Sequence, residues 1–329
     1  MNKNKQNALT LKILSSLPRN IKPTEYLMDI LEISKESAYR RLRDEIPFTF
    51  EEITRMAHDL NFSVDEIISM GSNSRVSFSV DIEQTRDDFP VFTQTIKEYL
   101  DRLVAISNAQ ETEIIIAMNN ILPFFFTHFN SLFKFSYFKY MQNNTKISLK
   151  NKFSEITLPE DLKEIKRTIE QQIQVCTKNV TFIIDSNIIH NLINDVLYFY
   201  KRNLISIEDL QALKSDMIKM IDLVEEMAQT GYFHESVEVQ IYLSFVNVDS
   251  NSLYLKCDNK EQSSFYIHNL APINAANPAV CSLHRKKIDV LKKYSRLITQ
   301  SNEIIQSAFF ERQRENIRNI EEKNIGIVF

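Results

Sequence analysis

The stretch LMDILEISKESAYRRLRDE, residues 27–45, decides how the N-terminal part of this chain folds. Leu27 and Leu31 recur at the spacing of one helical face, so they predict a first helix that packs against a core. Ser34 is a residue type that caps helix N-termini, so a second helix is expected over residues 35–44. The stretch therefore predicts two helices joined by a tight turn.

The inner positions of this stretch fit two helices that cross closely. Ala38 and Leu42 stand four residues apart and are expected to face inward, and the small Ala38 side chain permits a close approach. Ile33, in the turn, is expected to fill the angle between the helices. This pattern is typical of a helix-turn-helix unit, whose second helix enters the major groove of DNA.

The outer positions of the second helix carry residue types that suit DNA recognition. Arginine can bind guanine O6 and N7 bidentately, serine and tyrosine reach phosphates or base edges, and lysine supplies charge. Base-edge contacts are expected near the helix N-terminus, with Arg40 close to them, whereas Arg41 and Arg43 are expected mainly at phosphates. The predicted DNA-binding residues are Lys35, Glu36, Ser37, Tyr39, Arg40, Arg41 and Arg43.

The charge of the chain is unevenly distributed around this helix. Residues 1–43 hold nine Lys or Arg against four acids, a net charge of +5, and residues 44–70 hold one Arg against seven acids, a net charge of −6. The whole chain has a net charge of −4, so it is not a polybasic nucleic-acid binder. Binding to DNA is therefore expected to rely on the local basic patch and to depend strongly on salt. The alternative is a solvated helix face in a protein-interaction module that never contacts DNA.

Residues 7–70 as a whole predict five short helices and resemble the Cro/CI-type helix-turn-helix domains of phage repressors. Residues 31–34, LEIS, stand where that family often has Leu-Gly-Ile-Ser, and residues 48–53 and 56–67 resemble its fourth and fifth helices. The chain is also similar to a group of regulators common in Bacteroidetes that have a large, uncharacterised C-terminal region. Glu32 replaces the turn glycine, so it is expected to be strained if that position requires a positive φ.

Several classes of function are disfavoured by composition. The chain has only three glycines, and it contains none of the glycine motifs that cradle phosphates or present a nucleophilic serine. Its three cysteines are far apart, which argues against a zinc site and fits a reducing compartment. Residues 114–133 lack charge, but asparagines and a proline interrupt them, so a buried strand and helix are expected rather than a membrane span. We expect a cytoplasmic protein with no cofactor, no metal and no membrane partner.

The predicted organisation is a multi-domain, mainly α-helical protein. A helix-turn-helix DNA-binding domain is expected over residues 1–70, a linker over 71–79, and an α+β domain over 80–329. The α+β domain is expected to hold a mainly antiparallel sheet with long flanking helices. Its predicted strands include a three-stranded meander at residues 237–246, 252–257 and 264–269, and helices are predicted near residues 279–299 and 302–323.

The second domain carries weaker functional signals. Aromatic residues crowd residues 124–140, which predicts core packing, the wall of a ligand pocket or a dimer interface. The layout resembles that of GAF- and PAS-type sensory domains, so we expect effector sensing and a homodimer built by the terminal helices, with a small-molecule or protein effector. An enzyme in residues 80–329 is the alternative, and clustering of His190, Asp185 and Asp195 with another histidine in one cleft would favour it. We predict a transcriptional regulator that binds double-stranded DNA without catalysis.

Overall fold

The chain divides into two compact units, residues 1–78 and residues 79–329. This computed structural model describes residues 3–17, 21–60, 62, 64, 91–144, 146–234, 236–267 and 271–320. The predicted linker at residues 71–79 lies outside the described residues. Each unit has a hydrophobic core of its own, so each is described separately.

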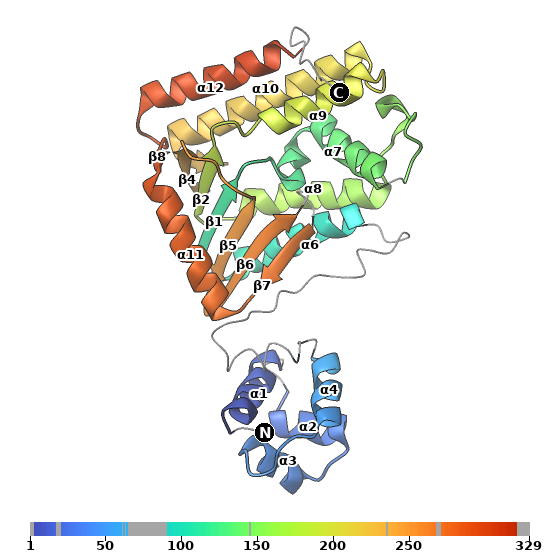
Figure 1. Ribbon diagram of the computed structural model, residues 1–329, viewed down its shortest axis with the longest axis vertical. Helices are drawn as coiled ribbons and strands as arrows, with labels where there is room; N and C mark the ends of the chain where they lie inside the picture. The colour runs from blue at the N-terminus through green and yellow to red at the C-terminus, as the bar shows by residue number, and fades with distance from the viewer. Residues whose placement is uncertain are drawn as a thin grey trace. The chain divides into compact units, whose positions relative to one another are not determined.

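The first unit, the helical unit, contains four of the five predicted helices (Figure 1). The fifth, expected over residues 64–69, lies outside the described residues apart from Val64. Thr49 and Glu52 form the predicted capping box at the start of the fourth helix. The helices are α1 (Lys3–Ser16), α2 (Pro23–Leu31), α3 (Lys35–Leu42) and α4 (Phe50–Asp59).

The core of the helical unit is small and continuous. Leu9 and Ile13 of α1, Leu27 of α2, Ala38 of α3 and Met56 of α4 are all fully buried in it. Ala38 is the residue predicted to allow close helix packing, and Ile33 and Leu42 pack against the same core from its edge. The predicted inner positions of the helix-turn-helix stretch are therefore confirmed.

The second unit, the sheet unit, is built on one sheet with the strand order β3-β4-β2-β1-β5-β6-β7, in which β8 also pairs with β4 (Figure 1). Alternate residues of β1 face opposite sides, so Ile114 and Ile116 enter one core and Ile115 and Ala117 enter another. The strands are β1 (Thr112–Met118), β2 (Val180–Asp185), β3 (Tyr232–Phe233), β4 (Val237–Ser244), β5 (Ser252–Cys257), β6 (Lys260–Ile267), β7 (Ala271–Ala275) and β8 (Ser295–Leu297).

The sheet is mainly antiparallel, as predicted, because five of its seven described strand pairings are antiparallel, but β2 pairs in parallel with both β1 and β4 at its centre. The strand order corrects the predicted meander. The meander consists of β5, β6 and β7. Strand β4 does not join it, because β2 and β1 lie between β4 and β5 in the sheet. Helical crossovers join β1 to β2 and β2 to β4, and such connections return the chain to the same end of the sheet, which makes the pairing parallel.

Two unequal helical layers cover the sheet. Among the described helices, α11 is the one that packs on the face that carries Ile115 and Tyr254, and the larger layer covers the other face (Figure 1). The predicted helix over residues 279–299 ends earlier, because the chain turns at Tyr294 and continues as β8. The helices are α6 (Val91–Asn108), η2 (Pro123–His128), α7 (Asn130–Asn143), η3 (Phe153–Glu155), α8 (Glu160–Val175), α9 (His190–Lys201), α10 (Ile207–Thr230), α11 (Pro278–Lys293) and α12 (Glu303–Arg318).

The apolar face of α12 is used inside the unit. Phe309, Phe310 and Ile317 are buried in the large core, and α12 packs against α10. Ile304, near the start of the same helix, does not belong to this buried set, because 87% of its surface is exposed. The expectation that the apolar stripe of this last helix forms the interface is therefore wrong, since that stripe completes the core of its own chain.

Candidate functional site

The turn between α2 and α3 fixes how α3 is presented. Glu32 ends α2 in the left-handed conformation, with φ 54° and ψ 41°, as predicted for a position where glycine is usual. Ser34 is the N-cap of α3, and its hydroxyl accepts a hydrogen bond from the Ser37 backbone N–H at 3.3 Å. The Glu32 side chain is exposed, so its carboxylate need not be buried to make this turn.

The far end of α3 is tied to α1. Asp44 also adopts a positive φ, of 60°, and its carboxylate accepts a hydrogen bond from the buried Thr10 hydroxyl at 3.0 Å. The backbone N–H of Glu45 donates to the Arg40 carbonyl at 2.8 Å, which closes the last turn. The helix is therefore held at both ends, and its core side is fixed by Ala38.

Five of the seven predicted DNA-binding residues project to solvent from α3. They present two arginines, one lysine, one tyrosine and one glutamate, so the exposed set is net positive. Arg40 makes a single exposed ion pair, at 3.5 Å from Glu45, which is weak in water. The exposed residues are Lys35, Glu36, Tyr39, Arg40 and Arg43.

Arg41 and Ser37 occupy a different position from the other five. The Arg41 guanidinium lies 2.7 Å from Glu52 Oε1 and donates to the Ser37 hydroxyl at 2.5 Å, and its side chain is only 12% exposed. The same Glu52 carboxylate caps α4 by accepting from the Thr49 backbone N–H at 2.8 Å. These contacts fasten α3 to α4 and turn Arg41 inward, so that most of its side chain is buried.

The electrostatics of Glu52 follow from these partners. Burial by itself would raise the pKa of this carboxyl group, but hydrogen bonds from Arg41 and from the Thr49 backbone outweigh it and hold the pKa below its ordinary value. Glu52 therefore stays ionised and keeps Arg41 in place. The sequence indicated the capping box, but it did not indicate that Arg41 would pair with the Glu52 carboxylate of that box. The pairing depends on how α3 and α4 pack.

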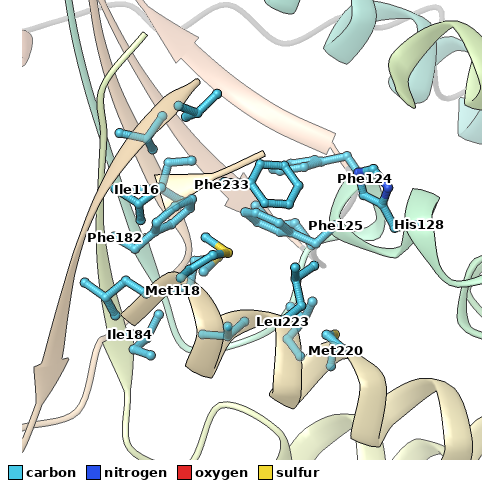
Figure 2. Close-up of a pocket in the computed structure, with 18 of the residues that line it drawn as sticks. Ile116, Met118, Phe124, Phe125, His128, Phe182, Ile184, Met220, Leu223 and Phe233 are labelled. Atoms are coloured by element: carbon cyan, nitrogen blue, oxygen red, sulfur yellow. The ribbon is translucent and has the colours of Figure 1, made fainter. Parts of the chain in front are cut away.

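A second candidate site is a cavity of about 220 Å³ inside the sheet unit. Side chains of β1 and β2, the short helix η2 and helix α10 converge on it (Figure 2). The residues labelled on its wall are Ile116, Met118, Phe124, Phe125, His128, Phe182, Ile184, Met220, Leu223 and Phe233.

The predicted aromatic stretch at residues 124–140 divides between two roles. Phe124, Phe125 and Phe129 line the cavity, and the Phe124 ring stacks on Tyr99 at 4.2 Å between centroids. Most of its remaining rings, Phe133 among them, are buried in the core and do not line the cavity. The core-packing interpretation is therefore confirmed for most of the stretch, and the ligand-pocket interpretation stays a prediction for the residues that line the cavity. The cavity residues from β1, β2 and α10 were not predicted.

Few polar side chains line the cavity. His128 is one of them, and its Nε2 atom is buried without a hydrogen-bond partner among the described residues. Burial lowers the pKa of His128 below its ordinary value, so the ring is neutral near pH 7. Arg102 also lines the wall, and its guanidinium donates to the Asn274 side-chain oxygen at 3.4 Å.

The residues named for the enzyme alternative do not form one cleft. His190 is exposed at the start of α9, and Asp195 forms an ion pair with Lys139. Asp185 is buried and accepts from the backbone N–H of Asn187 at 2.8 Å and of Val248 at 3.0 Å, which is a structural role. Among the described residues, no group of three His, Cys, Asp or Glu side chains is placed to hold a metal ion.

A buried histidine in another part of the sheet unit was assigned no site by the sequence. His284 of α11 contacts the Ser263 hydroxyl through Nδ1 at 2.9 Å and the Ser252 hydroxyl through Nε2 at 3.1 Å. Burial lowers its pKa to about 4, so the ring is neutral and joins α11 to β5 and β6. This network lies on the face of the sheet opposite the core that encloses the cavity.

Comparison with known proteins bears on the helical unit. Residues 18–110 match the family model of the BetR domain, a family of helix-turn-helix-like DNA-binding domains. The matched range contains α2, α3 and α4 and runs on through α6 of the sheet unit. Searches of curated proteins and of solved structures returned no match to the chain. The match to the BetR domain model indicates a DNA-binding, regulatory role in general.

In the part of the chain that the structure describes, no helix has the length and apolar character needed to span a membrane.

Proposed function

We propose that this protein is a sequence-specific, DNA-binding transcriptional regulator that reads the major groove with α3. The observation that carries the proposal is the division of the α3 arginines. Arg41 is fastened to Glu52, whereas Arg40 on the same short helix and Arg43 at its C-cap are exposed. An anchored helix with exposed cations on its outer face is what insertion into the major groove requires.

The exposed residues take different tasks in this proposal. Lys35 and Tyr39 lie in the N-terminal part of α3 and contact base edges or nearby phosphates, with Arg40 beside them. Arg43, after the last turn of α3, contacts phosphate. Glu36 accepts from a cytosine amino group or points away from the backbone. Ser37 and Arg41 act as supports of the helix rather than as DNA contacts, because they bond to each other and to Glu52.

The sheet unit serves in the proposal as an effector-sensing and dimerisation domain of a cytoplasmic homodimer. A dimer would present two recognition helices about one DNA turn apart, so its operator would be a palindrome. The cavity in the sheet unit supports the sensing role, because a preformed apolar pocket is the usual form of a small-molecule site. Analytical ultracentrifugation of the free chain tests the dimer directly.

The experiment that tests DNA reading begins with selection of bound sequences from random duplex DNA. Binding of the selected site is then measured over a range of salt for the R40A/R43A variant. We expect the affinity to fall at least tenfold, because each well-placed arginine contributes about 1–3 kcal/mol to binding. The salt slope should fall by about 1 for each phosphate that the variant no longer binds.

Arg55→Ala is the matched control, since Arg55 is an exposed arginine of the same unit that pairs with Glu51 on α4. It should leave affinity and salt slope unchanged. If R40A/R43A binds DNA as the unaltered protein does, α3 is not the reading helix, and the alternative of a protein-interaction module gains support.

A further inference from the structure

We propose that the cavity of the sheet unit is a binding site for one compact, uncharged, largely apolar molecule of about the size of two fused aromatic rings. Residues of the strands β1, β2 and β4 and of the helices α6, η2, α8, α10 and α12 line the cavity. Its role as the effector site rests on the proposed function, but the binding itself does not.

The volume sets the size of the ligand. Protein interiors are packed as densely as organic crystals, and voids larger than one water molecule are few. A cavity of roughly 150 Å³ lined by aliphatic and aromatic side chains stays dry and accepts benzene, which has six non-hydrogen atoms. Scaled to about 220 Å³, the same fit corresponds to about nine non-hydrogen atoms.

The side chains on the wall select for apolar surface. Phe125 of η2 and Phe182 of β2 approach edge to face, with centroids 5.8 Å apart, and Figure 2 shows them facing Leu223 and Met220 of α10 across the space. Aromatic rings offer both faces and edges to a flat ligand, and methionine side chains adapt to its outline. A ligand with a planar, apolar body is the best match to this wall.

The polar groups on the wall exclude a charged ligand. His128 is neutral, and it can satisfy one hydroxyl or carbonyl group of a ligand at the cavity edge, beside Phe124 (Figure 2). Arg102 is the cation on the wall, but its guanidinium is bonded to Asn274 and to the Tyr266 hydroxyl. A carboxylate entering the cavity would lose its hydration without a matched partner, which is costly.

The test uses 1-naphthol and 1-naphthoate as probes, because they share a ring system and differ in charge at pH 7. Calorimetric titration and thermal unfolding of the full chain should show saturable binding of 1-naphthol with a rise in the unfolding temperature of the sheet unit. The same concentrations of 1-naphthoate should give neither. Absence of 1-naphthol binding, or equal binding of both probes, would overturn the proposal.

Location is tested by filling the cavity. Leu223→Trp and Ile116→Phe place bulk into the space and should weaken 1-naphthol binding at least tenfold. Leu283→Trp is the matched control, since Leu283 is 59% exposed on α11 and does not line the cavity, and it should bind normally. Filled variants that fold and still bind 1-naphthol with full affinity would place the ligand elsewhere.

A second measurement applies even if the filled variants fail to fold. In the unaltered protein, 1-naphthol protons should show nuclear Overhauser effects to the methyl groups of Met118 and Met220. Binding without such effects contradicts the proposal. None of these readouts involves DNA. Failure of 1-naphthol binding would therefore not contradict the proposed role of α3 in reading DNA, and failure of DNA binding would not contradict the proposed ligand site.

Discussion

The two units of this protein each contain a polar network, partly buried in the helical unit and buried in the sheet unit, and the two networks are built in opposite ways. In the helical unit, Arg41, Ser37 and Glu52 form a charged network within one short stretch of chain, at the edge of the unit. In the sheet unit, His284 joins Ser252 and Ser263 in a neutral network whose members come from three different elements in the interior.

The difference follows from the cost of burying charge. The Arg41–Glu52 pair keeps 12% and 17% of its side-chain surface exposed, so it retains part of its hydration while it fixes α3. His284 is 7% exposed, and an imidazolium there would be poorly hydrated, so the ring is neutral and both of its nitrogens are paired with hydroxyl groups. A charged clamp suits a helix that faces outward, and a neutral one suits a closed core.

The largest expected difference between the two networks is the loss of stability of the sheet unit at acidic pH. His284 has a pKa of about 4 in the folded chain against about 6.5 when unfolded, so between these values the unfolded state binds more protons. The free energy of unfolding of the sheet unit should therefore fall as the pH drops from 6.5 to 4, by about 3 kcal/mol from this group. Denaturant titrations at pH 7 and pH 4.5 measure the loss.

His284→Gln removes the titrating group and keeps an amide for the serine hydroxyls, so its pH dependence should be flatter than that of the unaltered protein. Some slope should remain, because burial also lowers the pKa of His128. His190→Gln is the control, since His190 is exposed, and it should keep the full slope. Equal slopes for all three proteins would show that His284 is not held neutral by burial.

The next effect separates two arginines of one helix. Arg41→Met leaves Glu52 with an unpaired, partly buried carboxylate, and it should lower the stability of the helical unit by about 2 kcal/mol, between the values for exposed and buried pairs. Arg40→Met removes an exposed side chain and should change stability by less than about 0.5 kcal/mol. If α3 reads DNA, Arg40→Met should nevertheless be the variant that weakens binding while the unit remains folded.

Chemical denaturation followed by circular dichroism, together with DNA titration of both proteins at a temperature where both are folded, measures this crossed pattern. Loss of stability in Arg40→Met, or unchanged stability in Arg41→Met, would remove the distinction between a supporting and a presented arginine. That distinction is the basis for leaving Arg41 out of the proposed DNA contacts.

The helical unit could largely be predicted from the sequence because its signals are local. The Ser34 cap, the Thr49–Glu52 capping box and the inward Ala38 each depend on residues within one or two helical turns, and all are observed. These local signals could not predict which arginine of α3 would turn inward. Arg41 pairs with a residue eleven positions away, and the pairing depends on the packing of α3 against α4.

The sheet unit was predicted less well because its order is set by long-range pairing. The segments of β4, β5 and β6 were recognised, but β4 pairs with β2 and β8 rather than with β5. No local turn signal reports that a helical crossover has returned the chain to the sheet centre. The cavity could not be predicted for the same reason, since Met118, Phe182 and Leu223 line it from elements distant in sequence. Only the aromatic stretch at residues 124–140 indicated a pocket.

The smallest expected effect concerns the turn that presents α3. Glu32 holds a left-handed conformation, which costs a residue with a side chain about 1 kcal/mol or more, and its carboxylate is exposed and gains nothing from the position. Glu32→Gly should therefore stabilise the helical unit by about 0.5–1 kcal/mol, because the relief of strain exceeds the greater entropy of glycine in the unfolded chain. Glu36→Gly is the matched control: it removes the same charge from the helical first turn of α3 and should destabilise the unit by about 1 kcal/mol. Opposite signs for these two substitutions, measured by thermal unfolding, would show that backbone conformation rather than charge decides the effect, whereas equal signs would mean that Glu32 is not strained.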